Sequence, residues 1–199
     1  MLTEKREKFE KISKKTGQIF SKLGLTPNQY TLISLIFVLV SFYFLIKERL
    51  ILALIFFLLA AFLDFIDGAV AKFLKRETKE GAYLDTVSDR YVEGIILLGF
   101  LFLPLADFIL PAKVWIFLAF FGSFLTTYAK AAAKEKELVE TELKKGLLGR
   151  AERIILISLA IFLGIFNFSW IICPIIILAI FSNITALQRI FLSLAPSQN

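Results

Sequence analysis

Four aspartates, arranged as two closely spaced pairs, are the residues of this sequence best suited to chemistry. Asp64 and Asp67 lie three positions apart, and Asp85 and Asp89 lie four apart. In a helix, either spacing places both side chains on one face. Four carboxylates brought together would repel one another unless a cation lay between them. Ligand sets made only of oxygen favour Mg²⁺, Mn²⁺ or Ca²⁺ over zinc or copper, so the pattern predicts a hard divalent metal site.

The rest of the composition restricts the chemistry to carboxylates. The 199-residue sequence contains no His and a single Cys, Cys173. The sequence therefore excludes an imidazole base, a His-based triad, a His-ligated zinc ion and an internal disulfide. Any proton transfer or metal ligation is expected to fall to Asp or Glu.

Small residues accompany the aspartates. Gly68 directly follows Asp67, and Gly81 precedes Asp85 by four positions, with alanines at 69, 71 and 82. A wall with few side chains lets a bulky ligand approach the backbone closely. The pattern therefore favours a metal-dependent site for a phosphate-containing ligand.

Spacing alone leaves three alternative roles open for the aspartates. They could be ordinary residues of a membrane interface, neutralised by Lys72, Lys75, Arg76 and Arg90. They could form the ion path of a small cation transporter, which would give no reason for the positions of the glycines. A non-catalytic membrane scaffold is the third alternative, and four intact carboxylates disfavour it.

The elements that position the aspartates are predicted to be membrane-spanning helices. The sequence is 58% hydrophobic and 20% charged, against about 45–50% and about 25% for a soluble domain. Roughly 20 apolar residues are needed to cross a hydrocarbon core about 30 Å thick. The run that begins at Leu50 reaches this length only if its helix continues through Asp64 and Asp67. The run that ends at Ala106 does so only if its helix starts near Ala82, before the second pair.

Six spans are predicted in all, which makes the chain an all-α integral membrane protein. The interval between Arg153 and Arg189 lacks charge and is too long for one span, so a turn is expected within it. Besides the two aspartate-bearing helices, the spans are 23–46, about 114–133, and two within 154–188 that are separated near Gly164, Asn167 or Pro174.

The first 22 residues have a different character. They interleave Lys and Arg with apolar residues at a spacing of three to four, which predicts an amphipathic helix on the bilayer surface. The predicted organisation is an amphipathic segment, 1–22, followed by a six-helix membrane domain, 23–199.

The basic residues predict the orientation of the chain. Of the 23 Lys and Arg, only Lys47, Arg49 and Lys113 would lie on one face of the membrane. Because Lys and Arg are enriched on the cytoplasmic side, both chain ends and the aspartate site of this multi-pass cell-membrane protein are expected there. The net charge of +6 is accounted for by topology, so nucleic acid is not expected as a partner.

The aspartate region resembles the signature of the CDP-alcohol phosphotransferase family, which makes phospholipids. That signature reads Asp, two residues, Asp-Gly, two residues, Ala-Arg, eight residues, Gly, three residues, Asp, three residues, Asp. Lys72 stands where the family usually has Arg, so the charge is kept and the bidentate fork is lost. The resemblance extends over essentially the whole chain. The matching positions are Asp64, Asp67, Gly68, Ala71, Gly81, Asp85 and Asp89.

The resemblance implies transfer of a substituted phosphoryl group from a CDP-linked lipid to an alcohol, with release of CMP. Asp64, Asp67 and Asp85 would hold Mg²⁺ or Mn²⁺, expected as two ions. Asp89 would complete the metal site and accept the proton of the attacking hydroxyl. Thr26 is equally expected as the N-cap of the first span. The residues implied in CDP-lipid binding, besides the first three aspartates, are Thr26, Pro27, Asn28, Gln29, Gly68, Ala71, Lys72, Thr78 and Gly81.

Basic residues near helix ends indicate that the acceptor carries a phosphate. A basic residue buried in a membrane is costly unless it meets an anion, and Arg binds phosphate through fork-like contacts. The segment 149–153 resembles the family branch that makes phosphatidylinositol phosphate or archaetidylinositol phosphate from inositol phosphate, although Ala132 stands where that branch often has Arg. The expected acceptor-phosphate residues are Lys130, Arg150, Arg153 and Arg189.

The expected function is therefore transfer of a diacylglycerol or archaeol phosphate group from a CDP-lipid to inositol phosphate. The same chemistry with glycerol phosphate or another alcohol as acceptor is the alternative within the family. Membrane lipids are the expected surroundings, and the resemblance also implies a homodimer.

Overall fold

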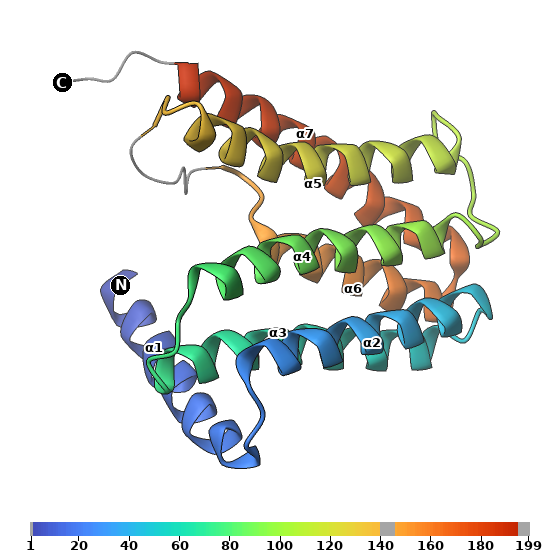
Figure 1. The fold of residues 1–199 in the computed structure, drawn as a ribbon. Coiled ribbons are helices and arrows are strands. Elements are labelled where there is room, and N and C mark those ends of the chain that lie inside the picture. Colours follow the sequence, from blue (N-terminus) through green and yellow to red (C-terminus); the bar gives the residue numbers. More distant parts are fainter. Residues whose placement is uncertain (1, 140–145, 195–199) are drawn as a thin grey trace.

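The computed structural model describes residues 2–139 and 146–194, and these residues are almost entirely helical (Figure 1). No β-strand occurs within the described ranges, so the prediction of an all-α protein is confirmed. Two short 3-10 turns, η1 (Ser21–Leu23) and η2 (Phe168–Ile171), precede α2 and α7. The α-helices are α1 (Leu2–Phe20), α2 (Pro27–Ile46), α3 (Leu50–Phe73), α4 (Lys79–Phe100), α5 (Ala112–Glu135), α6 (Arg150–Phe166) and α7 (Ile172–Leu194).

Helices α2 to α7 run alongside one another, and α1 crosses one end of this bundle (Figure 1). α2 packs against α3, and α5 packs against α7. Between these pairs, α4 contacts α2 and α5, while α6 contacts α3 and α7. The α3–α4 connection, the start of α6 and the last turn of α7 lie at the end that α1 crosses. That end is called the α1 end below.

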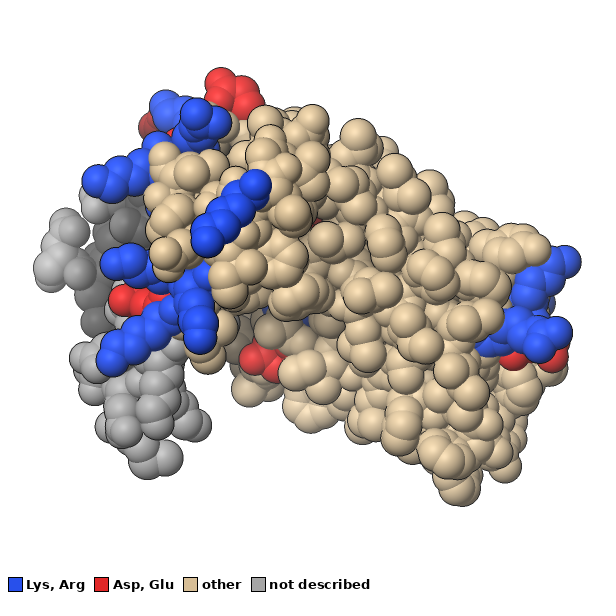
Figure 2. All heavy atoms as spheres, turned by 90° about the horizontal axis from the view of Figure 1, so that it is seen from below, with Lys and Arg blue, Asp and Glu red and all other residues tan. Residues whose placement is uncertain are grey.

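Within the part of the chain that the structure describes, four helical segments are long and apolar enough to cross a membrane. They are α2, α3, α5 and the unit from η2 through α7, Phe168–Leu194. α4 carries the second aspartate pair together with Arg90 and Glu93, and α6 has only 17 residues. Lys and Arg gather at the two ends of the molecule, more of them at the α1 end, with an uncharged belt between (Figure 2). These features support a membrane protein.

Two helix boundaries differ from, or sharpen, the sequence prediction. α4 ends at Phe100 and not near Ala106, because Pro104 cannot continue a helix and disfavours helical geometry in the residue before it. The break within the long uncharged interval falls at Asn167, one of the expected positions. Its side-chain oxygen accepts a hydrogen bond from the backbone N–H of Ser169 at 2.8 Å and so caps η2.

α1 is held against α3 near the aspartate region. Gly17 faces the backbone of Ala69 so closely that a side chain would not fit between the two helices. After η1, Gly24 adopts a left-handed conformation (φ 72°) that turns the chain into α2. The Tyr30 hydroxyl of α2 then donates to the Phe20 carbonyl at 2.8 Å. The N-terminal helix is thus fixed to the bundle by both α2 and α3.

A polar seam joins α5 to α7. Thr126 Oγ1 donates to the Ser182 carbonyl at 3.0 Å, and Asn183 Nδ2 donates to the Leu118 carbonyl at 2.9 Å. Gly122 makes this approach possible, because a Cβ built on it would lie 2.8 Å from the Asn183 backbone nitrogen. Small residues and interhelical hydrogen bonds are the usual means of helix association in membranes.

α4 and α5 are less closely joined. An apolar cavity of about 870 Å³ lies between them, lined by residues that include Gly94, Phe120 and Phe124. At the edge of this cavity, Arg90 Nη1 of α4 donates to the Ser123 carbonyl of α5 at 3.1 Å. Arg90 therefore provides a direct polar link between these two helices.

Substituting Gly122 with Ala should destabilise the protein by disturbing the packing of α5 against α7. We expect Gly122→Ala to lower the free energy of unfolding by about 1–3 kcal/mol, because the backbone of α7 leaves no room for a methyl group. Gly68→Ala is the matched control, since no atom lies within 4 Å of its added Cβ and the change gains helix propensity. Thermal unfolding in one detergent at one scan rate compares the two. Equal melting temperatures would contradict the proposed close packing.

Candidate active site

The two aspartate pairs meet because α3 and α4 are antiparallel neighbours in sequence, joined by a short connection. Asp67 lies six residues before the end of α3, and Asp85 lies six residues after the start of α4. At 1.5 Å per residue, both are about 9 Å from the helix ends. Asp64 and Asp89 lie about 14–15 Å from those ends by the same measure. The four carboxylates are therefore placed at two matching depths.

The geometry suits a hard divalent cation. Asp64, Asp67 and Asp85 each offer an oxygen, and these oxygens lie within 4.8 Å of one another. Oδ1 of Asp64 and Oδ1 of Asp89 are buried, and a cationic nitrogen of Arg150 is in contact with both. Buried carboxylate oxygens require a positive partner. The donor set is all oxygen, as Mg²⁺ and Mn²⁺ prefer.

The four aspartates differ in their access to solvent. The Asp85 side chain is 44% exposed, whereas those of Asp64 and Asp89 are 10% and 11% exposed. Beside them, Gly68 is exposed and its missing side chain leaves open space. The site is thus open toward Asp85 and Gly68 and closed at the depth of Asp64 and Asp89, so a ligand would enter from the α1 end.

Arg150, the first residue of α6, reaches into this group of aspartates. Its Nη2 lies 2.6 Å from Asp64 Oδ1 and also contacts Asp89 Oδ1, and its Nη1 lies 3.9 Å from Asp85 Oδ1. The sequence prediction placed Arg150 with the acceptor phosphate. The structure gives it three aspartate partners, and a role toward the acceptor stays a prediction.

Thr31 holds the remaining aspartate. Its hydroxyl donates to Asp67 Oδ2 at 2.6 Å in a buried contact between α2 and α3. This bond fixes the orientation of the Asp67 carboxylate. Sequence reasoning missed Thr31, because it lies 36 residues from Asp67 and no spacing rule connects them.

The residues expected near the nucleotide surround the starts of α2 and α4. Thr26 caps α2 through a capping box with Gln29, with hydrogen bonds of 3.3 and 2.8 Å. Thr78 caps α4 by accepting from the Gly81 N–H at 3.0 Å. A Cβ on Gly81 would lie 3.5 Å from Asn28 Oδ1, so the two helix starts are adjacent. The N-cap expectation for Thr26 is confirmed.

The remaining residues expected to bind the CDP-lipid lie on the last turn of α3 and the first turn of α2. Ala71 is half-buried and Lys72 is exposed, while Pro27 occupies the first turn of α2. Their roles toward a nucleotide stay predictions. The exposed position of Lys72 is compatible with contact to a ligand that enters from the α1 end.

A buried carboxylate, Glu93, connects α4 to α6. Arg90 donates to it through both guanidinium nitrogens at 3.1 Å, and Arg153 Nε donates to it at 3.0 Å. The Arg90 Nη2 also lies 3.9 Å from Asp89 Oδ2. Glu93 and Arg153 have side chains only 4% and 3% exposed. The ion pair with Glu93 therefore holds the Arg153 guanidinium in place where little water reaches it.

Glu93 was also missed by sequence reasoning, although a signal was available. It is a charged residue one turn beyond Asp89 and directly before an apolar stretch, where an acidic side chain is costly without a partner. The partner, Arg153, is 60 residues away and could be identified only from the fold.

The remaining expected acceptor residues occupy α5 and α7. Lys130 is half-buried on α5. Arg189 of α7 donates from Nη1 to the Thr126 carbonyl at 2.9 Å and lies close to Gly146. The three expected arginines thus have different partners: aspartates for Arg150, Glu93 for Arg153 and a backbone carbonyl for Arg189.

Comparison with known proteins places this geometry in context. Residues 24–186 match the CDP-alcohol phosphatidyltransferase family. The chain is 33% identical over 192 residues to the archaetidylinositol phosphate synthase of Pyrococcus horikoshii, covering 96% of this chain and 95% of that protein.

Solved structures share the fold. The phosphatidylinositol phosphate synthase of Mycobacterium tuberculosis, in a crystal structure with CDP-DAG bound, is 23% identical with a TM-score of 0.79, covering 94% of this chain and 96% of that one. A second structure of it, in complex with manganese and citrate, also has a TM-score of 0.79 at 23% identity, covering 93% and 90%.

The sequence signature, the convergence of its aspartates and the match over most of the chain agree with one another. They favour an enzyme over the cation transporter and the non-catalytic scaffold. The chain belongs to the CDP-alcohol phosphatidyltransferase family, as an enzyme that transfers substituted phosphate groups.

Proposed function

We propose that this enzyme transfers a diacylglycerol or archaeol phosphate group from a CDP-lipid to inositol phosphate and releases CMP. The observation that carries the proposal is the meeting of Asp64, Asp67 and Asp85 within 4.8 Å at an open end of the bundle. The synthase names of the relative from Pyrococcus horikoshii and of the solved structures support inositol phosphate as acceptor.

Asp64, Asp67, Asp85 and Asp89 would hold Mg²⁺ or Mn²⁺, expected as two ions. When bound, such ions neutralise charge on the diphosphate and on the departing CMP. The oxygens that Asp64, Asp67 and Asp85 bring within 4.8 Å of one another support this assignment, as does the solved relative in complex with manganese.

Asp89 is proposed as the general base. Its carboxylate accepts the proton of the acceptor hydroxyl while the hydroxyl oxygen forms a bond to the lipid-linked phosphorus. The bond from that phosphorus to the CMP oxygen breaks, and CMP leaves with the electron pair. A carboxylate base fits a sequence without His. The depth of Asp89 shields the reaction from water, which would otherwise compete with the acceptor.

The nucleotide is proposed to bind where the starts of α2 and α4 meet. Thr26 and Thr78 fix these helix starts, and Gly68 and Gly81 keep the approach clear of side chains. The proposed contacts are Thr26, Pro27, Asn28, Gln29, Gly68, Ala71, Lys72, Thr78 and Gly81 with Asp64, Asp67 and Asp85.

The acceptor phosphate is proposed to bind Lys130, Arg150, Arg153 and Arg189. They come from α5, α6 and α7, whereas the helix starts that would bind the nucleotide belong to α2 and α4. Arg153 is held by Glu93, so its guanidinium is positioned before a ligand arrives.

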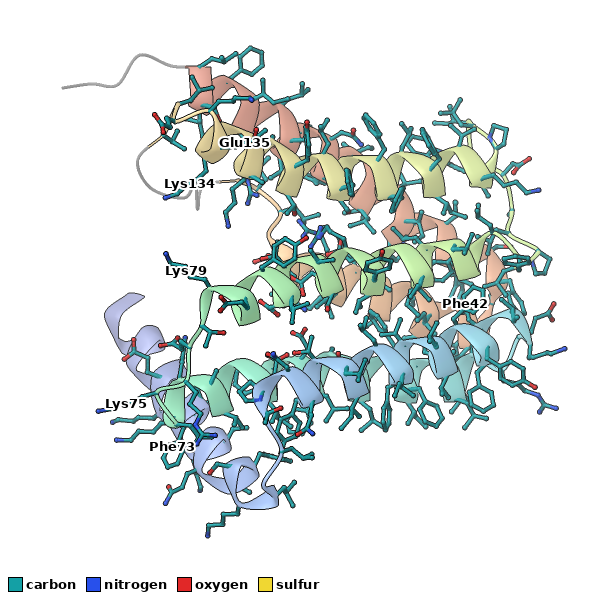
Figure 3. The ribbon with its side chains drawn as sticks, in the orientation of Figure 1. Phe42, Phe73, Lys75, Lys79, Lys134 and Glu135 are labelled. Carbon is teal, nitrogen blue, oxygen red and sulfur yellow. The ribbon has the colours of Figure 1, made fainter. Side chains whose placement is uncertain are left out.

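In the membrane, α4 and α6 are proposed to complete six spans with the four apolar segments. Lys75, Lys79 and Lys134 lie at the α1 end, whereas Phe42 lies toward the other end (Figure 3). This supports a cytoplasmic α1 end that carries both chain ends and the site.

The N-terminal segment, 1–22, is proposed to lie on the bilayer surface and the domain 23–199 to span it. Ile12 and Ile19 of α1 are more than half exposed, as expected if lipid covers them. The predicted orientation also places Lys144 and Lys145 on the cytoplasmic face, and these two residues lie outside the described ranges. A homodimer stays part of the proposal.

An acceptor panel with one CDP-lipid donor tests the function directly. We expect CMP release to require both a divalent ion and inositol phosphate, with CMP measured at equal concentrations of inositol phosphate, glycerol phosphate, serine and unphosphorylated inositol. Turnover with glycerol phosphate but not inositol phosphate would leave the family chemistry intact and make the acceptor assignment wrong.

Replacing Asp89 by Asn should abolish most turnover and spare donor binding. Loss of a general base lowers kcat by about 10²- to 10⁴-fold, while Asn keeps the size of the side chain. Asp107→Asn is the matched control, because Asp107 caps α5 far from the site through a bond to Ala112 N–H. Steady-state CMP release and CDP-lipid binding are measured for both variants. A kcat within the range of the control would exclude Asp89 as the base.

Arg153→Ala should weaken acceptor binding selectively. We expect the KM for inositol phosphate to rise about tenfold or more, because hydrogen bonds to charged groups contribute about 1.5–3 kcal/mol. The KM for the CDP-lipid should change little, and Arg153→Lys should recover part of the loss. Equal increases in both KM values would indicate that Arg153 acts only through the fold.

A further inference from the structure

Arg150 occupies the side of the aspartates to which a metal ion would also bind. We propose that Arg150 is an internal counter-cation of the site, which divalent ions displace from the aspartates, and that the displaced guanidinium then binds the acceptor phosphate. This inference rests on the proposed function for the identity of the metal and acceptor. It assigns to Arg150 a role that its position in the sequence did not indicate.

The contacts of Arg150 support competition with the metal. One nitrogen, Nη2, touches Asp64 Oδ1 from α3 and Asp89 Oδ1 from α4. The same two oxygens are buried from solvent. A cation that binds both must take the place of this nitrogen, because two positive groups in contact with one carboxylate oxygen repel each other strongly in a poorly solvated site.

Charge balance explains why a counter-cation is needed at all. Asp64, Asp67 and Asp89 carry three potential negative charges at a depth where solvation is poor, and Asp85 adds a fourth nearer to the solvent. Among the described residues, Arg150 is in ion-pair contact with three of them. Such an arrangement stabilises the folded protein before ligands bind, and it also lowers the affinity for any metal that must replace the guanidinium.

The position of Arg150 on its helix allows it to move. It is the first residue of α6, directly after Gly149, and its side chain is 29% exposed. Arg153, one turn later, is only 3% exposed and is held by Glu93. Rotation of the long Arg150 side chain away from the aspartates therefore requires no repacking of α6. In this proposal, Arg153 is already in position to bind the acceptor phosphate, whereas Arg150 moves into position when the metal binds.

Mn²⁺ binding to the full chain in detergent, without lipid or acceptor, provides the first test. The Kd is measured from the electron paramagnetic resonance signal of free Mn²⁺ for the unsubstituted protein, Arg150→Gln and Arg150→Lys. Lys79→Gln is the matched control, because it also removes one positive charge from the α1 end but from an exposed residue at the start of α4. The retention volume in size-exclusion chromatography checks that each variant is folded.

We expect Arg150→Gln to bind Mn²⁺ about tenfold more tightly or better, because a competing charge has been removed. Lys79→Gln should stay within about twofold, since exposed charges are screened, and Arg150→Lys should lie between the other Arg150 forms. An unchanged or weaker Mn²⁺ affinity in Arg150→Gln would overturn the proposal, because it would mean that Arg150 supports the metal ligands instead of competing with the ion.

Chemical labelling of the unsubstituted protein tests the same proposal without relying on a variant. Phenylglyoxal labelling of Arg150, measured by peptide mass spectrometry against exposed Arg49 at the other end of the bundle, should rise when Mn²⁺ is added. Inositol phosphate added with Mn²⁺ should reduce it again. Labelling that does not rise with Mn²⁺ would overturn the displacement.

The two tests separate this inference from the proposed function. Labelling that rises with Mn²⁺ but is protected by no phosphate-bearing acceptor would support displacement and remove Arg150 from the acceptor site. If another acceptor replaced inositol phosphate in protection and in turnover, the displacement would stand and the substrate assignment would change.

Discussion

Negative charge deep in an apolar helical bundle must be balanced, and the arrangement of the site follows from this requirement. Asp64 and Asp67 of α3 face Asp85 and Asp89 of α4, and the basic group that contacts both helices comes from a third one. α6 supplies it by beginning at Arg150. The aspartates can lie at this depth because α6 packs against α3 and begins with Arg150, whose positive charge balances theirs.

The same balance continues into the bundle as an alternating series of charges. Asp89 is followed by Arg90, which pairs with Glu93, which pairs with Arg153. The series joins α4 to α6, and Arg90 extends it to α5 where an apolar cavity separates α4 from that helix. A substitution of Arg90 would therefore disturb both the charge near Asp89 and the packing of α4 against α5.

The helices and the aspartate motif could be predicted because both depend on short-range rules. Helical periodicity places Asp64 with Asp67, and the short α3–α4 connection brings Asp85 and Asp89 to the same depth. Breaks at Asn167 and Pro104 follow from local backbone chemistry, although the effect of Pro104 on α4 was not anticipated. Family resemblance then gave the chemistry that spacing alone left open.

The partners of the site residues could not be predicted, because they depend on how distant helices pack. Thr31 reaches Asp67 across 36 positions, and Glu93 reaches Arg153 across 60. Arg150 was recognised as a basic residue in a costly position, but whether its anion belonged to a ligand or to the protein was not contained in the sequence. Pairing over such separations is decided by the whole bundle.

The placement of the site at one end of the bundle has a consequence for the membrane as a whole. The aspartates and the expected arginines lie toward the α1 end, while the opposite end carries the α2–α3, α4–α5 and α6–α7 connections. A lipid donor that reacts there would keep its tails in the adjacent leaflet throughout, and the product would remain in that leaflet. Growth of the two leaflets would therefore be unequal unless a separate process moved lipid across the bilayer.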